Sequence, residues 1–170
     1  MALPDDVKAL VEATMARVGD DGRVLIVRPE GHAELTMPGQ ADVDTLELTD
    51  RFDRATDLAF QRRYRLAVVI DAPGIIGGVA TRQMLAYLRN VGAHGVLAVF
   101  PRSPTATREP DTEWSVSDFL GLGFRRAEQA KTLASDYWVY RYNIYDYKIT
   151  PDWLNSRYWA NPEQWDRERW

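Results

Sequence analysis

The chain has 170 residues, of which 45% are hydrophobic and 27% charged, a balance typical of a single globular domain, which excludes a disordered or fibrous chain. It contains no cysteine and only two histidines, which excludes disulfides, thiolate catalysis and cysteine-based metal sites. The net charge of -4 gives no overall attraction to nucleic acid. The start of the chain has no secretory pattern, and no apolar run is long enough to span a membrane. We therefore expect a cytoplasmic protein that binds neither nucleic acid nor a membrane.

Helical and strand patterns alternate through the first part of the chain. Pro4, Asp5 and Asp6 are helix start signals, and apolar residues then recur at helical spacing over 7–18 until Gly19. The apolar run 23–27 predicts a strand buried on both faces. A loop over 32–42 and a short strand over 45–48 follow, and 55–63 has a weak helical pattern that runs into a local basic cluster at 61–65.

The same alternation continues to the end of the domain. We predict strands over 66–70 and 95–100, and between them a loop over 72–78 and a helix whose apolar stripe is Ala80, Met84, Leu88 and Val91, closed by Gly92. Segment 102–112 is polar and contains prolines, which indicates an exposed loop. Further along, Ser115 and Asp118 form a capping pattern for a short helix with Val116, Phe119 and Leu120 on its apolar face.

Segments 124–128 and 137–147 alternate as strands and predict an antiparallel pair. Together these elements predict an α/β fold with three layers: a mostly parallel sheet, helices on both faces, and a C-terminal antiparallel strand pair. We expect the domain to extend over 1–148. We also expect an aromatic-rich tail over 149–170 to pack on the same domain, with a contact to a second copy as an alternative that would make a homodimer.

Three stretches together resemble the C-terminal half of a class I S-adenosylmethionine-dependent methyltransferase with a Rossmann-type fold. Residues 64–71 resemble that family's fourth strand, residues 88–99 its passage from helix to fifth strand, and residues 118–124 the helix that leads to its sixth strand. They occur in the family's order, and a terminal antiparallel strand pair is what that fold implies. The resemblance covers roughly half of the chain.

The resemblance implies S-adenosylmethionine as the cofactor, bound where the parallel strands end. Glu30 and Gly31 follow the first strand, Glu47 or Asp50 stands where the family uses a carboxylate on the ribose hydroxyls, and Asp71, followed by Pro73 and Gly74, stands where the substrate-side motif would be. The chain departs from the family at the first loop, which has one glycine and no recognisable helix before the second strand. We therefore expect a reduced or lost cofactor site.

Each of these positions also has a purely structural explanation. Asp71 could cap the following loop, Glu30 and Gly31 could form a plain turn, and the glycines of 74–78 could form a flexible turn rather than a phosphate loop, since no P-loop lysine follows. His32 and His94 do not make a recognisable metal motif. The tyrosines of 137–147 are expected in the core rather than as stacking surfaces for bases.

Three functions remain open on this evidence. The first is a methyltransferase-like protein that binds a small-molecule ligand, S-adenosylmethionine or a related adenine nucleotide, with Glu30, Glu47 and Asp71 converging on a pocket. The second is a non-catalytic interaction module that uses its aromatic tail. The third is a degenerate receiver domain, whose paired acids after the first strand are replaced here by Arg28 and Pro29.

Overall fold

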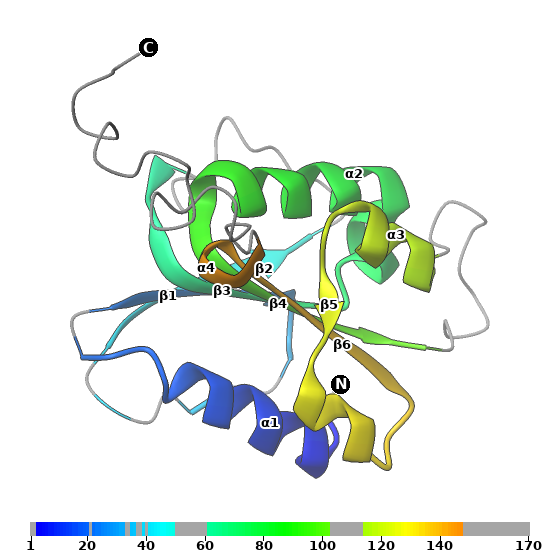
Figure 1. Cartoon of the computed structure of the whole chain (residues 1–170), viewed down its shortest axis with the longest axis horizontal. Helices are drawn as coiled ribbons and strands as arrows, with labels where there is room; N and C mark the ends of the chain where they lie inside the picture. Colours follow the sequence, from blue (N-terminus) through cyan, green and yellow to red (C-terminus); the bar gives the residue numbers. More distant parts are fainter. Residues whose placement is uncertain are drawn as a thin grey trace, which may run out of the picture.

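One six-stranded mixed sheet lies between helices in the computed structural model, which describes residues 3–20, 22–32, 35–36, 39, 41–49, 61–102 and 114–147 (Figure 1). The elements in chain order are α1 (Asp5–Met15), β1 (Arg23–Pro29), β2 (Asp42–Leu48), β3 (Tyr64–Ile70), α2 (Pro73–Tyr87), the π-helix η2 (Leu88–Gly92), β4 (Ala93–Pro101), α3 (Val116–Gly121), β5 (Arg125–Arg126), the 3-10 helix η4 (Glu128–Thr132), β6 (Tyr137–Asn143) and α4 (Ile144–Tyr147).

The strands are arranged in the order β2-β1-β3-β4-β6-β5. The first four are parallel to one another, while β6 runs antiparallel to β4 and β5 antiparallel to β6. The predicted α/β fold, the parallel apolar strands and the antiparallel C-terminal pair are therefore confirmed. The three parallel central strands are buried runs of aliphatic residues because both of their faces are covered.

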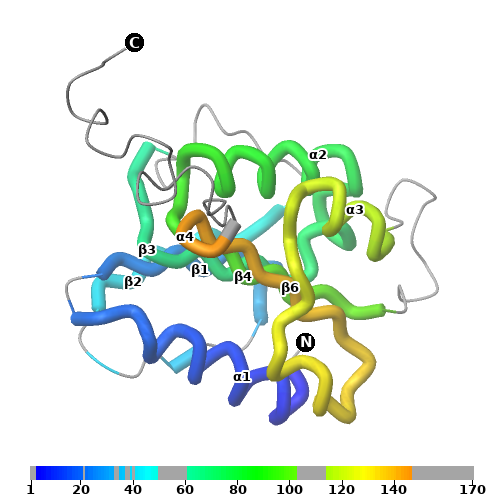
Figure 2. Tube along the Cα trace, viewed as in Figure 1, coloured from blue at the N-terminus to red at the C-terminus, as the bar shows by residue number. Residues whose placement is uncertain are grey.

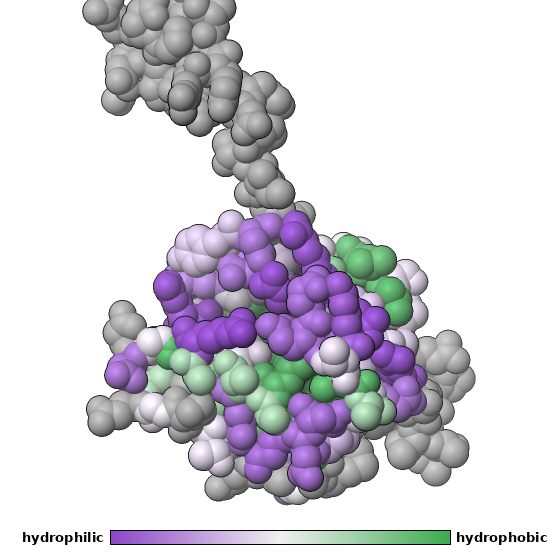
Figure 3. Space-filling view, turned by 60° about the horizontal axis from the view of Figure 1, so that its bottom comes forward, coloured by the Kyte–Doolittle hydropathy of each residue, from purple (hydrophilic) through white to green (hydrophobic). Residues whose placement is uncertain are grey.

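Alternate residues of the strands meet different helices. On one face, Val24, Ile26, Val68 and others pack against α1 and η4. The tube in Figure 2 shows α1 along this side of the sheet, and Figure 3 shows that polar side chains there surround a narrow strip of hydrophobic surface. The carboxylate of Asp6 on α1 also accepts hydrogen bonds from the backbone N–H groups of Ala134 and Ser135, at 3.0 and 3.1 Å. Burial alone would raise the pKa of Asp6, but these bonds outweigh it and lower the pKa.

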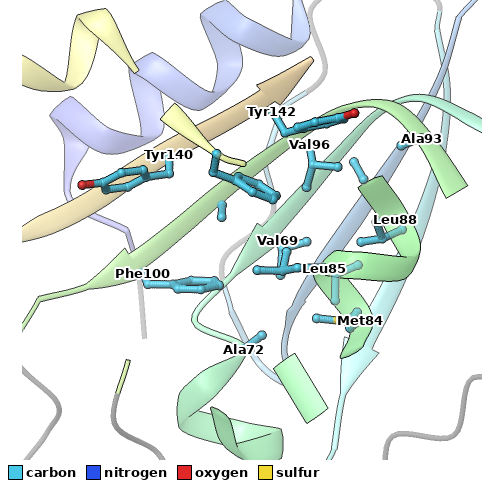
Figure 4. Close-up of a cluster of buried hydrophobic side chains, with 14 of the residues drawn as sticks. Val69, Ala72, Met84, Leu85, Leu88, Ala93, Val96, Phe100, Tyr140 and Tyr142 are labelled. Atoms are coloured by element: carbon cyan, nitrogen blue, oxygen red, sulfur yellow. The ribbon is translucent and has the colours of Figure 1, made fainter. Parts of the chain in front are cut away.

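The other face packs against α2, η2 and α3 (Figure 1). Met84 and Leu85 of α2 lie over Val69 and Val96 of the sheet (Figure 4). Further along this face, the ring of Phe119 stacks on that of Tyr140 with their centroids 4.2 Å apart. The aromatic residues of β6 thus pack in or against the core, as expected. The expectation was wrong for Tyr145, which lies beyond β6 and is 67% exposed.

The α2 region differs from the predicted loop over 72–78. The helix begins at Pro73, whose fixed φ is already helical and whose missing N–H would have no partner in the first turn. The break comes at Gly77 instead, where φ is 78° and ψ 164°, and the hydroxyl of Thr81 donates to the Gly77 carbonyl at 2.8 Å. A flexible loop was therefore the wrong prediction for 73–76.

Two predicted strands are shorter in the structure. Only Arg125–Arg126 pairs within 124–128, and the second strand ends at Asn143, because 144–147 turns into the short helix α4. The side chain of Asn143 accepts a hydrogen bond from the Tyr145 N–H at 2.9 Å, which favours the turn over a further extended residue.

The short helix α3 confirms the predicted cap but not the whole of its predicted apolar face. The carboxylate of Asp118 accepts bonds from the Ser115 N–H and hydroxyl, at 2.9 and 2.6 Å. Phe119 is fully buried, whereas Val116 and Leu120 are exposed, as is Val91 at the end of η2. Six residues of helix can direct only one large side chain into this core.

Most of 55–63, most of 102–112 and the whole tail 149–170 lie outside the described residues. Within the described part, no helix combines the length and the apolar character needed to cross a bilayer.

Candidate functional site

The strands that follow β1 in the chain lie on both sides of it, which creates a topological switch point in the sheet. The next strand, β2, pairs with one side of β1, and the strand after it, β3, pairs with the other side. In open parallel sheets the loops at such a point diverge, so ligands bind beyond the carboxyl ends of the strands. We refer to this side of the sheet as the carboxyl edge.

Six of the seven predicted site residues lie at the carboxyl edge. Glu30 and Gly31 directly follow β1, Glu47 is the penultimate residue of β2 and is in register with Arg28, and Asp71 directly follows β3. Pro73 and Gly74 begin α2. Asp50 lies outside the described residues. The strand directions thus bring three separate loops to one edge, as the sequence predicted.

Asp71 is held in an uncommon backbone conformation. It is 4% exposed, its φ is 42°, and its N–H donates to the carbonyl of Val99 on β4 at 3.0 Å. It is the only residue other than glycine with positive φ in the described part of the chain. This region strains residues with a Cβ, and aspartate is among those that tolerate it best. The bond to β4 fixes this backbone at the end of β3.

His32 is the second buried polar residue of the carboxyl edge. It is 7% exposed, and its N–H bonds the Pro29 carbonyl at 3.2 Å, so the first loop turns back over β1. Burial lowers the pKa of His32, the charge of Asp71 opposes this effect and the charge of Arg28 adds to it. The imidazole is therefore neutral at pH 7, in the electrostatic range of the Asp71 carboxylate.

Arg28 connects the first loop to β2. Its Nη1 donates to the His32 carbonyl at 2.9 Å and its Nη2 to Oε1 of Glu47 at 3.1 Å. The side chain is 12% exposed, against 47% for Glu47. The Nε of Arg28 is buried and has no hydrogen-bond partner among the described residues. A buried donor without a partner costs about 1–3 kcal/mol, so an acceptor from outside the chain would be favoured there.

Gly31 leaves room beside this cluster. Its φ is 71°, and a Cβ at this position would meet no atom of the described residues within 4 Å. Glycine is therefore needed for the turn, and the backbone at this point is open to an approaching group. Glu30 beside it is exposed.

Sequence reasoning missed the roles of His32 and Arg28. A lone histidine in a loop carries no signal by itself, and Arg28 was considered only as a residue that replaces, with Pro29, the paired acids of a receiver domain. The available signal was their position: both lie within five residues of the end of a fully apolar strand, which is where polar side chains meet ligands or each other.

No protein among the curated sequences matches this chain with significance. A family model described as a family of unknown function matches residues 3–170, almost the whole length. The chain therefore belongs to that family of unknown function, DUF6231.

Proposed function

We propose that this protein binds S-adenosylmethionine, or a related adenine nucleoside, in a reduced methyltransferase-like site at the carboxyl edge between β1 and β3. The observation that carries the proposal is the convergence of the first loop, the end of β2 and the start of α2 around buried Asp71 and His32. The order of the strands, with β6 alone running opposite to the other five, supports the family resemblance of 64–71, 88–99 and 118–124.

The charge at this edge suits a cationic ligand with hydroxyl groups. Glu30, Glu47 and Asp71 supply three carboxylates at the ends of β1, β2 and β3, where Arg28 carries the one guanidinium of the described residues. At the end of β4, Arg102 is paired with Asp136 at 3.8 Å. A sulfonium and an ammonium group would be attracted by these carboxylates, whereas the phosphates of a nucleotide would be repelled. We therefore expect the ligand to be a nucleoside without phosphates.

The residues present fit such a ligand in part. Arg28 occupies Oε1 of Glu47, and Oε2 has no hydrogen-bond partner in the described part of the chain, so it can accept from a ribose hydroxyl. The open backbone at Gly31 gives the ligand room. The helix that the family places between its first two strands has no counterpart among residues 30–32, 35–36, 39 and 41. This cradle is therefore reduced, and if the site also catalyses, its reaction is methyl transfer.

Calorimetric titration with S-adenosylmethionine, S-adenosylhomocysteine and ATP tests the proposal. We expect micromolar binding of S-adenosylmethionine and no binding of ATP. S-adenosylhomocysteine should bind more weakly than S-adenosylmethionine, because its sulfur carries no charge. Replacing Glu47 by Gln should weaken binding about tenfold or more, since a hydrogen bond to a charged group is lost. Asp42→Asn at the opposite end of β2 is the matched control and should bind like the wild type.

The ion pair between Arg28 and Glu47 also favours a second candidate, the non-catalytic interaction module. An arginine that already occupies the ribose-binding carboxylate is expected where a cofactor site has been lost. Absence of heat with millimolar S-adenosylmethionine would reject the nucleoside site and leave this second candidate.

A further inference from the structure

The opposite side of the sheet, formed by the amino ends of β1 to β4, holds a cavity of its own. We call this side the amino edge. The cavity has a volume of about 390 Å³ and lies on the α1 side, between the end of α1, the starts of β3 and β4, η4 and the end of β6. A second cavity of about 480 Å³ adjoins it and shares Arg65 and His94 with it. The first is within the size range of small-molecule sites.

Two guanidinium groups in this cavity have no carboxylate partner. The Nη1 of Arg65 lies 3.3 Å from Nδ1 of His94 and 3.4 Å from the hydroxyl of Tyr145, and neither is an anion. Because arginine can only donate, Nδ1 of His94 is the acceptor in this contact. Arg17, at the end of α1, forms no side-chain hydrogen bond or ion pair with any described residue.

The other charged groups of the cavity are already compensated. Arg141 pairs with Asp146 at 3.0 Å, and Glu128 pairs with Lys131 at 2.6 Å. The uncompensated charge at this site is therefore that of Arg17 and Arg65. Two guanidiniums match a phosphate monoester, which carries about -1.5 to -2 charges at pH 7, better than they match a single carboxylate.

An aromatic ring lies beside these cations. Tyr145 on α4 is 67% exposed, although tyrosine is a residue that usually buries its ring. Its ring centroid lies 5.8 Å from Cζ of Arg65 and 5.9 Å from the His94 ring, which it meets edge to face. A flat ring held here would stack against an aromatic group that is already fixed by two neighbours.

We propose that the amino-edge cavity binds a phosphorylated small molecule with a flat ring, its phosphate on Arg17 and Arg65 and its ring against Tyr145. A small molecule suits the site better than a nucleic acid, because the cavity is recessed and the whole chain carries a net charge of -4, which repels a polyanion. This site is separate from the one at the carboxyl edge and does not depend on it.

Titration of the full-length protein with phenyl phosphate, followed by amide NMR shifts, tests this site. We expect shifts at residues of the cavity and tighter binding than that of inorganic phosphate or phenol. Arg65→Gln should weaken binding about tenfold or more, and so should Arg17→Gln. The second variant provides the test if the first folds poorly. Tyr145→Ala should reduce phenyl phosphate to the affinity of inorganic phosphate.

Two control variants keep the test specific. Arg102→Gln removes one positive charge from an exposed residue outside both cavities and should leave binding unchanged. Glu47→Gln at the carboxyl edge should also leave it unchanged, so failure of either proposed site can be recognised separately. The proposal is wrong if phenyl phosphate causes no shifts at millimolar concentration, if Arg102→Gln weakens it as much as Arg65→Gln, or if single-stranded RNA binds the cavity more tightly.

Discussion

The strands β1 and β2 carry an arginine–carboxylate pair at each end, and the two pairs lie in different surroundings. At the amino edge Arg23 bonds Asp42 at 2.9 Å, with the two side chains 40% and 62% exposed. At the carboxyl edge Arg28 bonds Glu47 at 3.1 Å and is only 12% exposed. The same type of ion pair is thus exposed to solvent at the amino ends of these two strands, whereas at their carboxyl ends its arginine is buried.

This difference extends to the two edges as a whole. The carboxyl edge is acidic around the ends of β1, β2 and β3, with a buried aspartate, a buried histidine and a donor that lacks a partner in the described structure. The amino edge is basic and open, with exposed arginines around a cavity. The two proposed sites therefore differ in the charge of the ligand that they would attract, and experiments on either edge can test this difference.

The largest effect on stability is expected at Arg28. Arg28→Ala removes the bonds to the His32 carbonyl and to Glu47, and should lower the free energy of unfolding by about 2 kcal/mol. The same change at Arg23 should cost about 0.5 kcal/mol or less, because exposed ion pairs contribute little. Urea unfolding of both variants measures this. Equal losses would mean that the edges do not differ in burial as described.

A smaller effect is expected from the backbone of Asp71. Asp71→Ala should be about 1 kcal/mol less stable than Asp71→Gly, because alanine is strained at a φ of 42° and glycine is not. Thermal or urea unfolding of the pair isolates the backbone, since both variants lack the carboxylate. If alanine were tolerated as well as glycine, this residue could not be under conformational strain.

The smallest expected effect is a pH dependence caused by His32. Because the pKa of His32 in the folded protein lies below its ordinary value of 6.5, the unfolded chain takes up the proton first. Stability should therefore fall as the pH decreases from 6.5 through the folded pKa, and His32→Gln should flatten that fall.

The charge of Asp71 raises the pKa of His32, so Asp71→Asn should lower that pKa further, as followed by the imidazole signals in NMR. An unchanged pKa of His32 would show that the side chains of His32 and Asp71 do not interact electrostatically.

The sheet was predictable because its central strands are continuous aliphatic runs, and such runs form strands that are buried on both faces. The positions of Glu30, Glu47 and Asp71 followed directly, since parallel strands end at the same edge. The start of α2 was less predictable: the same Pro73 and glycines suit both a loop and a first helical turn, and only packing of Ile75 and Ile76 against the core decides between them.

The amino-edge cavity could not be predicted in this way. The basic cluster at 61–65 was visible in the sequence, but its meaning depends on Arg17 and Tyr145, which come from opposite ends of the chain. Nothing in local periodicity places those side chains around one cavity. The site proposed at this edge depends on the fold bringing Arg17, just after α1, and Tyr145 of α4 to one cavity.

The bonds from Ala134 and Ser135 to Asp6 have a consequence for how the protein is made. The first helix emerges from the ribosome early, yet its carboxylate finds these partners only after some 128 further residues have been synthesised. Until then these two hydrogen bonds cannot form, although β1 and β3, which pack against the apolar stripe of α1, have already been synthesised. A nascent chain that stalls before residue 134 would therefore lack the contact that joins α1 to the segment before β6.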